Sequence, residues 1–236
     1  MFITFKKWSA LYLLVLLVLF AGFAAILWRG SAINASKNLV LEQAGKAVLV
    51  IDPGHGGMDG GAVAADGTVE AGINLAVGLQ MEALSELLGR EVLLTRREDV
   101  SLHDEAAGSV RQKKVSDLKN RAGLANSVPG AVLVSIHQNS LPEAKTVHGA
   151  QAFYNPGGEA LAQGVQAALN AAINDRPKEP KAAGSGIYLL EHAQVPAVLV
   201  ECGFLSNPDE TALLNTQAYQ TRLAVTILAS VLENLP

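Results

Sequence analysis

The sequence lacks the features of several common classes of protein. Its 236 residues include one cysteine, which excludes an intrachain disulfide, and cysteine usage therefore gives no information on the redox compartment. Lys and Arg number 18 against 22 Asp and Glu, and the net charge of −4 provides no electrostatic basis for binding nucleic acid. There is no HExxH zinc motif and no internal repeat. What is present is a chain that is 50% hydrophobic and long enough for one sizeable domain with a short appendage.

The N-terminal segment has the length and flanks of a membrane span. The run from Trp8 to Trp28 contains no charged side chain, Lys6 and Lys7 precede it, and Arg29 ends it. A span needs about 20 apolar residues, whereas a signal-peptide core has about 7–15. Indole rings favour the membrane–water interface, and early lysines favour a cytoplasmic N-terminus.

We therefore expect three segments along the chain. Residues 1–29 are predicted to form a transmembrane anchor, residues 30–46 a linker, and residues 47–236 a domain outside the cytoplasm. Small residues at 31–35 allow the alternative that the segment is cleaved as a signal peptide. Both alternatives predict export of the domain.

From residue 47 onward, short β-branched runs alternate with longer segments of helical periodicity. The runs predict strands at 47–52, 91–95, 131–136, 149–154, 187–190 and 197–201. The periodic segments predict helices at 70–88, 116–126 (N-capped by Ser116), 158–173 and 216–235, with an exposed loop at 174–185. Strands separated by helices of this length indicate a single α/β domain, with a mostly parallel twisted sheet and helices on both faces.

Ionisable residues stand where the predicted strands end. His55 follows the first strand in a glycine-rich loop, His137 follows the third, and Glu201 ends a late apolar run. In open α/β sheets, functional groups gather beyond the carboxyl ends of the strands. Glu70 begins the first helix, where a carboxylate is favoured, and the preceding loop can fold it back towards His55.

These four residues have the composition of a catalytic zinc site. Two histidines and one carboxylate form a three-ligand set that leaves zinc an open position for water. The remaining carboxylate can then act as general base. Taken singly, His137 is more often a hydrogen-bonded structural histidine, and Glu70 an ordinary carboxylate at a helix start. Only their occurrence together favours catalysis.

The same residues lie in segments that resemble a known family. The segments 52–57, 135–139 and 201–207, together with Glu70, resemble the zinc N-acetylmuramoyl-L-alanine amidases of the Amidase_3 type, and the resemblance covers about residues 47–235. It implies that His55, Glu70 and His137 bind Zn²⁺ and that Glu201 is the catalytic glutamate. The implied reaction cleaves the amide between N-acetylmuramic acid and L-alanine of the peptidoglycan stem peptide.

A narrower resemblance concerns residues 96–126 and the N-terminal segment. They are similar to the membrane-anchored sporulation amidases that act in forming muramic-δ-lactam in spore cortex. The resemblance implies a location in the intermembrane space of the forespore. It also implies a lipoprotein activator as a possible partner, because some members of that group depend on one.

Several other residues have two interpretations. Cys202 adjoins Glu201, but alternation along a strand turns adjacent side chains to opposite faces, which favours a buried thiol over a zinc ligand. Arg96 and Arg121 either bind an anionic group of the substrate or pair with nearby carboxylates. The histidines outside the motifs are expected at the surface or in hydrogen bonds: His103, His148 and His192.

Two rival functions are compatible with this pattern. One is a different zinc hydrolase, such as an exopeptidase acting on free peptides. The other is a non-catalytic module that binds the cell wall. The expected signature of the second is loss of a ligand or of the base, and the sequence retains all four residues.

Overall fold

The computed structural model describes residues 47–235. The predicted anchor at 1–29 and the linker at 30–46 lie outside the described residues. Within the described part of the chain, none of the helices combines the length and the apolar character that a membrane span requires.

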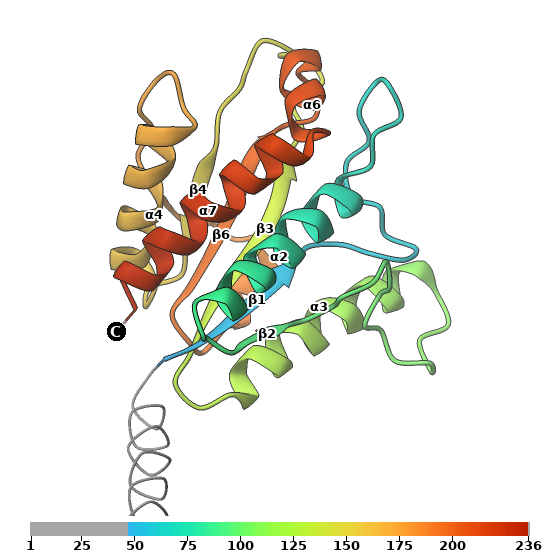
Figure 1. Cartoon of the computed structure of the whole chain (residues 1–236). Helices are drawn as coiled ribbons and strands as arrows, with labels where there is room; N and C mark the ends of the chain where they lie inside the picture. Colours follow the sequence, from blue (N-terminus) through green and yellow to red (C-terminus); the bar gives the residue numbers. More distant parts are fainter. Residues whose placement is uncertain (1–46, 236) are drawn as a thin grey trace, which may run out of the picture. The chain divides into compact units, whose positions relative to one another are not determined.

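A six-stranded sheet forms the centre of the domain. Its strands are β1 (Val48–Pro53), β2 (Val92–Leu94), β3 (Ala131–Asn139), β4 (Gln151–Tyr154), β5 (Lys181–Ala182) and β6 (Ala197–Phe204), in the order β2-β1-β3-β6-β4-β5. Figure 1 shows β1, β3 and β6 side by side. Every neighbouring pair is parallel except β4 and β6, which are antiparallel. The sheet is therefore mixed, with the mostly parallel character that the sequence predicted.

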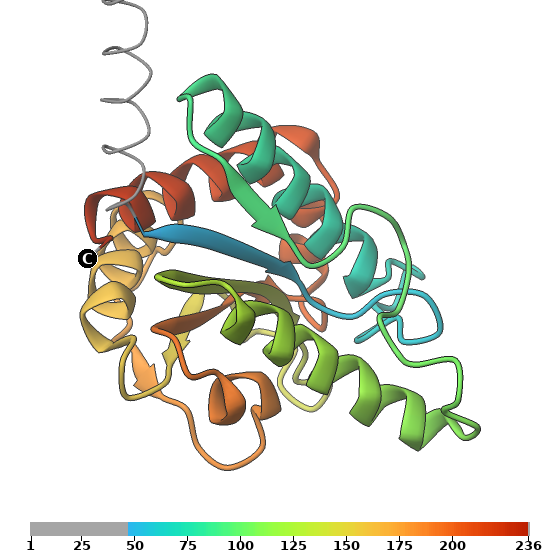
Figure 2. The same cartoon turned by 90° about the horizontal axis from the view of Figure 1, so that it is seen from below.

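Helices cover both faces of the sheet, as predicted (Figure 2). They are α2 (Glu70–Leu87), α3 (Val110–Ser127), α4 (Glu159–Ala172), α5 (Tyr188–His192), α6 (Pro208–Leu214) and α7 (Gln217–Glu233). Alternation along β3 supplies both cores. Val134 and Ile136 belong to the hydrophobic cluster that includes residues of α2, α4 and α7, whereas Leu133 belongs to the cluster that includes residues of α3 and α5. All three side chains are fully buried.

The strand order fixes where a functional site can form. The chain passes from β1 to β2 on one side and then returns to β3 on the other side of β1. The crossovers α2 and α3 consequently lie on opposite faces, and the carboxyl ends of β1 and β3 form the switch point at which such folds carry their functional groups. The loop with His55 follows β1, and His137 lies near the end of β3.

Some predicted elements were wrong in type or extent. The predicted strand at 187–190 is the start of α5, because a run of four apolar residues does not distinguish a strand from a buried helical turn. The predicted loop at 174–185 contains β5, and α6 was not predicted. Helix α3 begins earlier, since Ser109 and not Ser116 caps it, in a capping box with Gln112.

Helix α2 lies close against β1 at one glycine. A Cβ atom on Gly78 would be 2.7 Å from Cγ of Pro53, so a larger residue would push α2 away from the strand that leads to His55. Gly123, in the middle of α3, has open space around the corresponding position.

We expect Gly78→Ala to lower the free energy of unfolding by about 1–3 kcal/mol, because the added methyl group overpacks the interface between α2 and β1. Gly123→Ala is the matched control and is expected to raise it by up to about 1 kcal/mol, through helix propensity alone. Urea unfolding followed by circular dichroism measures both. Equal effects of the two substitutions would contradict the close packing of α2 against β1 at Gly78.

Candidate metal centre

His55 is held in a conformation that few residues adopt. Its φ is 61°, in the left-handed region, where a non-glycine residue carries strain. Two buried arginines hold the backbone around it. Arg121 donates to the carbonyl oxygens of Pro53 (2.9 Å) and His55 (2.7 Å), and Arg96 to those of Pro53 (2.8 Å) and Gly54 (2.9 Å). These hydrogen bonds hold the backbone from which the imidazole projects.

Arg121 and Arg96 therefore have a structural role. Both are nearly inaccessible, with 1% and 3% of their surface exposed. Arg121 forms a buried ion pair with Asp52 (2.8 Å) and a second ion pair with Asp117 (2.7 Å). Burial opposes ionisation of Asp52, but the charge of Arg121 and hydrogen bonds from neighbouring hydroxyls outweigh it and lower the pKa of the carboxyl. Pairing with carboxylates, one of the two interpretations from sequence, is therefore what the structure contains for Arg121. The hydrogen bonds of Arg96 within residues 47–235 go to backbone carbonyl oxygens instead.

His137 and Glu201 lie opposite each other on neighbouring strands. They are Cα partners in the parallel pair of β3 and β6, so their side chains point to the same face of the sheet. A register shift follows directly, between His137 and Asn139, where the ladder ends. The imidazole and the carboxyl group consequently lie side by side near the carboxyl ends of the two strands.

Glu70 brings the two histidines together. Its Oε1 atom lies 3.0 Å from Nδ1 of His137 and 3.3 Å from Nε2 of His55. The ligand atoms of all three residues lie within 4.8 Å of one another, a grouping that can hold a metal ion. The two rings lie edge to face, with their centroids 4.8 Å apart. Three residues predicted from different parts of the chain thus form one cluster.

Two glycines leave the space that this cluster occupies. A Cβ atom on Gly54 would lie 2.1 Å from Nε2 of His137. A Cβ atom on Gly61, whose φ is 72°, would lie 2.4 Å from Oε2 of Glu70 and 2.7 Å from the ring of His55. Any other residue at either position would displace a member of the cluster.

The charge of Glu70 is balanced by the histidines. Only 3% of this residue is exposed, and burial by itself would raise the pKa of its carboxyl. The hydrogen bonds and charges of His137 and His55 outweigh burial and hold the pKa well below its ordinary value. Glu70 is thus a carboxylate with two imidazole nitrogens facing one of its oxygens, a donor set that fits a divalent cation.

Glu201 differs from Glu70 in its hydrogen bonding. Its Oε2 atom is covered by protein and has no hydrogen-bond partner among residues 47–235. Burial raises the pKa of Glu201 to about 7, and the positive charge of His137 only partly offsets this effect. A carboxyl group with this pKa exchanges a proton readily near neutrality, which is what a general acid or base requires.

His55 also has an outer partner that sequence reasoning missed. Its Nδ1 atom lies 3.1 Å from Asp59, which in turn forms an ion pair of 2.9 Å with Lys114 on α3. Burial lowers the pKa of His55, but the hydrogen bonds and charges of Glu70 and Asp59 outweigh it and raise the pKa. A carboxylate on the far nitrogen of a histidine fixes its tautomer and ring orientation. The spacing of four residues from His55, in a glycine-rich loop, was the available signal.

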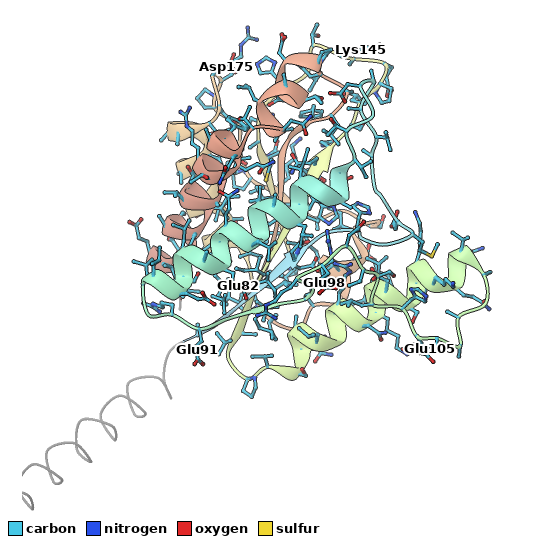
Figure 3. The ribbon with its side chains drawn as sticks, turned by 45° about the vertical axis from the view of Figure 1, so that its right-hand side comes forward. Glu82, Glu91, Glu98, Glu105, Lys145 and Asp175 are labelled. Atoms are coloured by element: carbon cyan, nitrogen blue, oxygen red, sulfur yellow. The ribbon has the colours of Figure 1, made fainter. Side chains whose placement is uncertain are left out.

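The other candidate ligands lie elsewhere. Cys202 is fully buried on the opposite face from Glu201, as predicted, and burial raises the pKa of its thiol. His148 pairs with Asp175 (3.0 Å), which lies at the surface at the same end of the domain as α6 (Figure 3). His103 accepts or donates a hydrogen bond with Ser101, and His192 stacks on a tyrosine. None of these histidines belongs to the cluster.

Fold and site together define a class of protein. An α/β domain with a His–Glu–His cluster and a neighbouring carboxyl group of raised pKa at its switch point has the layout of a metal-dependent hydrolase. A family model described as N-acetylmuramoyl-L-alanine amidase, Amidase_3, matches residues 49–233. The chain belongs to this family of enzymes.

Relatives within the family include proteins from several bacteria. The chain is 34% identical to the germination-specific N-acetylmuramoyl-L-alanine amidase of Bacillus subtilis, over 78% of each chain. It is 28% identical to the N-acetylmuramoyl-L-alanine amidase AmiA of Escherichia coli, over 91% of this chain and 89% of AmiA. Among solved structures, the CwlD amidase of Clostridioides difficile in complex with the GerS lipoprotein is 36% identical, with a TM-score of 0.75 over 80% of this chain and 98% of that chain.

In the metal-free protein, we expect Glu201→Gln to raise the free energy of unfolding by about 1–3 kcal/mol near pH 8 and to leave it unchanged near pH 4. The pKa of Glu201 is about 7 in the folded state, against an ordinary 4.5. Stability therefore falls as the pH rises from about 4.5 to about 7, where only the unfolded chain loses its proton. A glutamine side chain does not titrate, so Glu201→Gln removes this loss of stability.

Urea unfolding after chelation, at several pH values, measures the effect. The exposed Glu86 offers the same substitution outside the site, and Glu86→Gln is expected to show no pH-dependent gain. A gain for Glu201→Gln that is the same at every pH would contradict the raised pKa of the Glu201 carboxyl group.

Proposed function

We propose that this chain is a zinc-dependent N-acetylmuramoyl-L-alanine amidase. It would hydrolyse the amide between N-acetylmuramic acid and L-alanine of peptidoglycan stem peptides. The observation that carries the proposal is the covered Oε2 of Glu201, which has no hydrogen-bond partner in the described part of the chain and lies beside the cluster of His55, Glu70 and His137, in a chain of the amidase family.

The ligand roles follow from the donor set. His55, Glu70 and His137 would hold the zinc ion, since two imidazole nitrogens and one carboxylate are a common set for catalytic zinc. When bound, zinc supplies Lewis-acid activation of a water molecule and of the scissile carbonyl group. The cluster also favours zinc over harder cations such as Mg²⁺, which prefer oxygen ligands throughout.

Glu201 would move the proton. As a carboxylate it accepts a proton from the attacking water, whose oxygen forms the new bond to the carbonyl carbon. It then delivers that proton to the amide nitrogen of L-alanine as the carbon–nitrogen bond breaks. The products are the free carboxyl group of the lactyl side and the free amine of the stem peptide.

The sequence relatives support a narrower role. Identity of 34% to a germination-specific amidase supports action on spore cortex during sporulation, in muramic-δ-lactam formation. Residues 1–29 would anchor the enzyme in the membrane, with the catalytic residues outside the cytoplasm, in the intermembrane space of the forespore. The relative solved in complex with a lipoprotein supports a lipoprotein as a possible activating partner.

We expect Glu201→Gln to bind zinc like the wild type and to lower turnover by about 10²–10⁴-fold, because the ligands remain and the base is lost. His137→Ala is expected to lose both zinc and turnover. His148→Gln, at the surface, should retain both. Zinc content of the purified full-length chain and mass spectrometry of digested peptidoglycan measure the two quantities.

The products also separate the rival functions. Free stem peptides that retain L-alanine at the amine end support the amidase. Cleavage between amino acids would indicate a peptidase, release of sugars a glycosidase, and zinc binding without any product a wall-binding module. Near-wild-type turnover in Glu201→Gln would remove that residue from the reaction.

A further inference from the structure

Asn74 is a fully buried polar residue on α2, one helical turn after Glu70. Its neighbours Ile73 and Val77 on the helix belong to the hydrophobic core. A buried side-chain amide costs free energy unless it forms its hydrogen bonds inside the protein. The hydrogen bonds of this amide therefore indicate its role in the structure.

Asn74 connects the three segments that carry the proposed ligands. Its Nδ2 group donates to Oε1 of Glu70 (3.1 Å) and to the carbonyl oxygen of Gly54 (3.2 Å). Its Oδ1 atom accepts from Nε2 of Gln138 (3.2 Å). Gly54 directly precedes His55, and Gln138 directly follows His137. One amide thus contacts one ligand and the backbone or side chain next to the other two.

The oxygen that Asn74 contacts is the one that both imidazoles face. Oε1 of Glu70 also accepts from the backbone N–H of Gln138 (3.0 Å), while Oε2 accepts from the backbone N–H of Ala62 (2.8 Å). With both oxygens held, the carboxylate has one orientation before any metal arrives. A ligand that is already oriented loses less conformational freedom on binding.

We infer that Asn74 is a positioning residue that sets the affinity of the site for zinc. It holds the Glu70 carboxylate and the two histidine segments at the spacing that the metal requires. This inference rests on the proposed zinc site, and it adds an outer residue that the ligand set by itself does not identify. Residues in this position typically change metal affinity by about 10–100-fold when substituted.

Two substitutions separate hydrogen bonding from packing. Asn74→Ala removes the amide and leaves a cavity, whereas Asn74→Leu removes the amide and fills the space. We expect both to weaken zinc binding by about 10–100-fold, measured by competition with a chromophoric chelator. At saturating zinc, both are expected to regain turnover within about threefold of the wild type, because Glu201 is untouched. If Asn74 were needed only for packing, Asn74→Leu would bind zinc with the affinity of the wild type.

Ser85→Ala is the matched control. Ser85 lies on the same helix, is fully buried and donates to the carbonyl oxygen of Met81 (2.8 Å), away from the cluster. Thermal unfolding of the metal-free proteins reports the loss of stability in each variant. Ser85→Ala is expected to lose stability and to keep its zinc affinity within about twofold.

Each outcome decides one of the two claims. If the wild type binds no zinc, the proposed metal site fails. If the wild type binds zinc and Asn74→Leu binds it equally well, the role of Asn74 fails alone. If neither Asn74 variant folds, Gln138→Met decides, since it removes the donor to Oδ1 and keeps the backbone bond to Glu70. A loss of zinc affinity of about threefold or more supports the inference, and unchanged affinity overturns it.

Discussion

The site depends on a buried carboxylate. Glu70 is almost inaccessible to water, and an isolated charge in such a place would be strongly destabilising. Two imidazoles, two backbone N–H groups and the amide of Asn74 converge on its two oxygens. His55 and His137 are 82 positions apart in the sequence (137 − 55), and both rings face this carboxylate. The three residues consequently lie close enough together to bind one metal ion.

A second buried charge supports the first. The ion pair of Arg121 with Asp52 lies beneath the loop that presents His55, and the remaining donors of Arg121 and Arg96 bind carbonyl oxygens of that loop. A buried ion pair is weak evidence for net stability, because desolvation offsets much of the attraction. Its use here is geometric, since it sustains a left-handed conformation at His55 that the backbone would otherwise leave.

The two glutamates show how environment separates roles. Glu70 has two imidazole partners and is held as a carboxylate, whereas Glu201 is half-buried and its covered Oε2 atom has no hydrogen-bond donor among residues 47–235. Burial of one carboxyl group with partners and of another without them moves their pKa values in opposite directions. In the proposed function, the same chemical group therefore serves as a metal ligand in Glu70 and as a proton carrier in Glu201.

Much of this arrangement could be predicted from sequence, for a definite reason. Strands alternating with helices indicate a mostly parallel sheet, and the carboxyl ends of parallel strands meet at one edge, so His55, His137 and Glu201 were expected at the same edge of the sheet. The position of Glu70 depended on a loop folding back, which only the family resemblance made specific.

The contacts of the residues around the proposed ligands could not be predicted from the sequence in this way. Asn74 reads as an ordinary helix residue until tertiary packing buries it, and Arg96 and Arg121 contact backbone carbonyls that no sequence pattern marks. The helix at 188–192 was mistaken for a strand because its apolar run is too short to show a period. The predicted anchor at 1–29 lies outside the described residues and stays a prediction.

The central claim is that one metal ion is held by His55, Glu70 and His137. X-ray absorption at the zinc edge, on the full-length chain in detergent, tests it most directly. The account predicts a shell of nitrogen and oxygen at about 2.0–2.1 Å, with the outer-shell scattering of two imidazole rings. A sulfur neighbour at about 2.3 Å, which only Cys202 or a methionine can supply, or the absence of imidazole scattering, would contradict it.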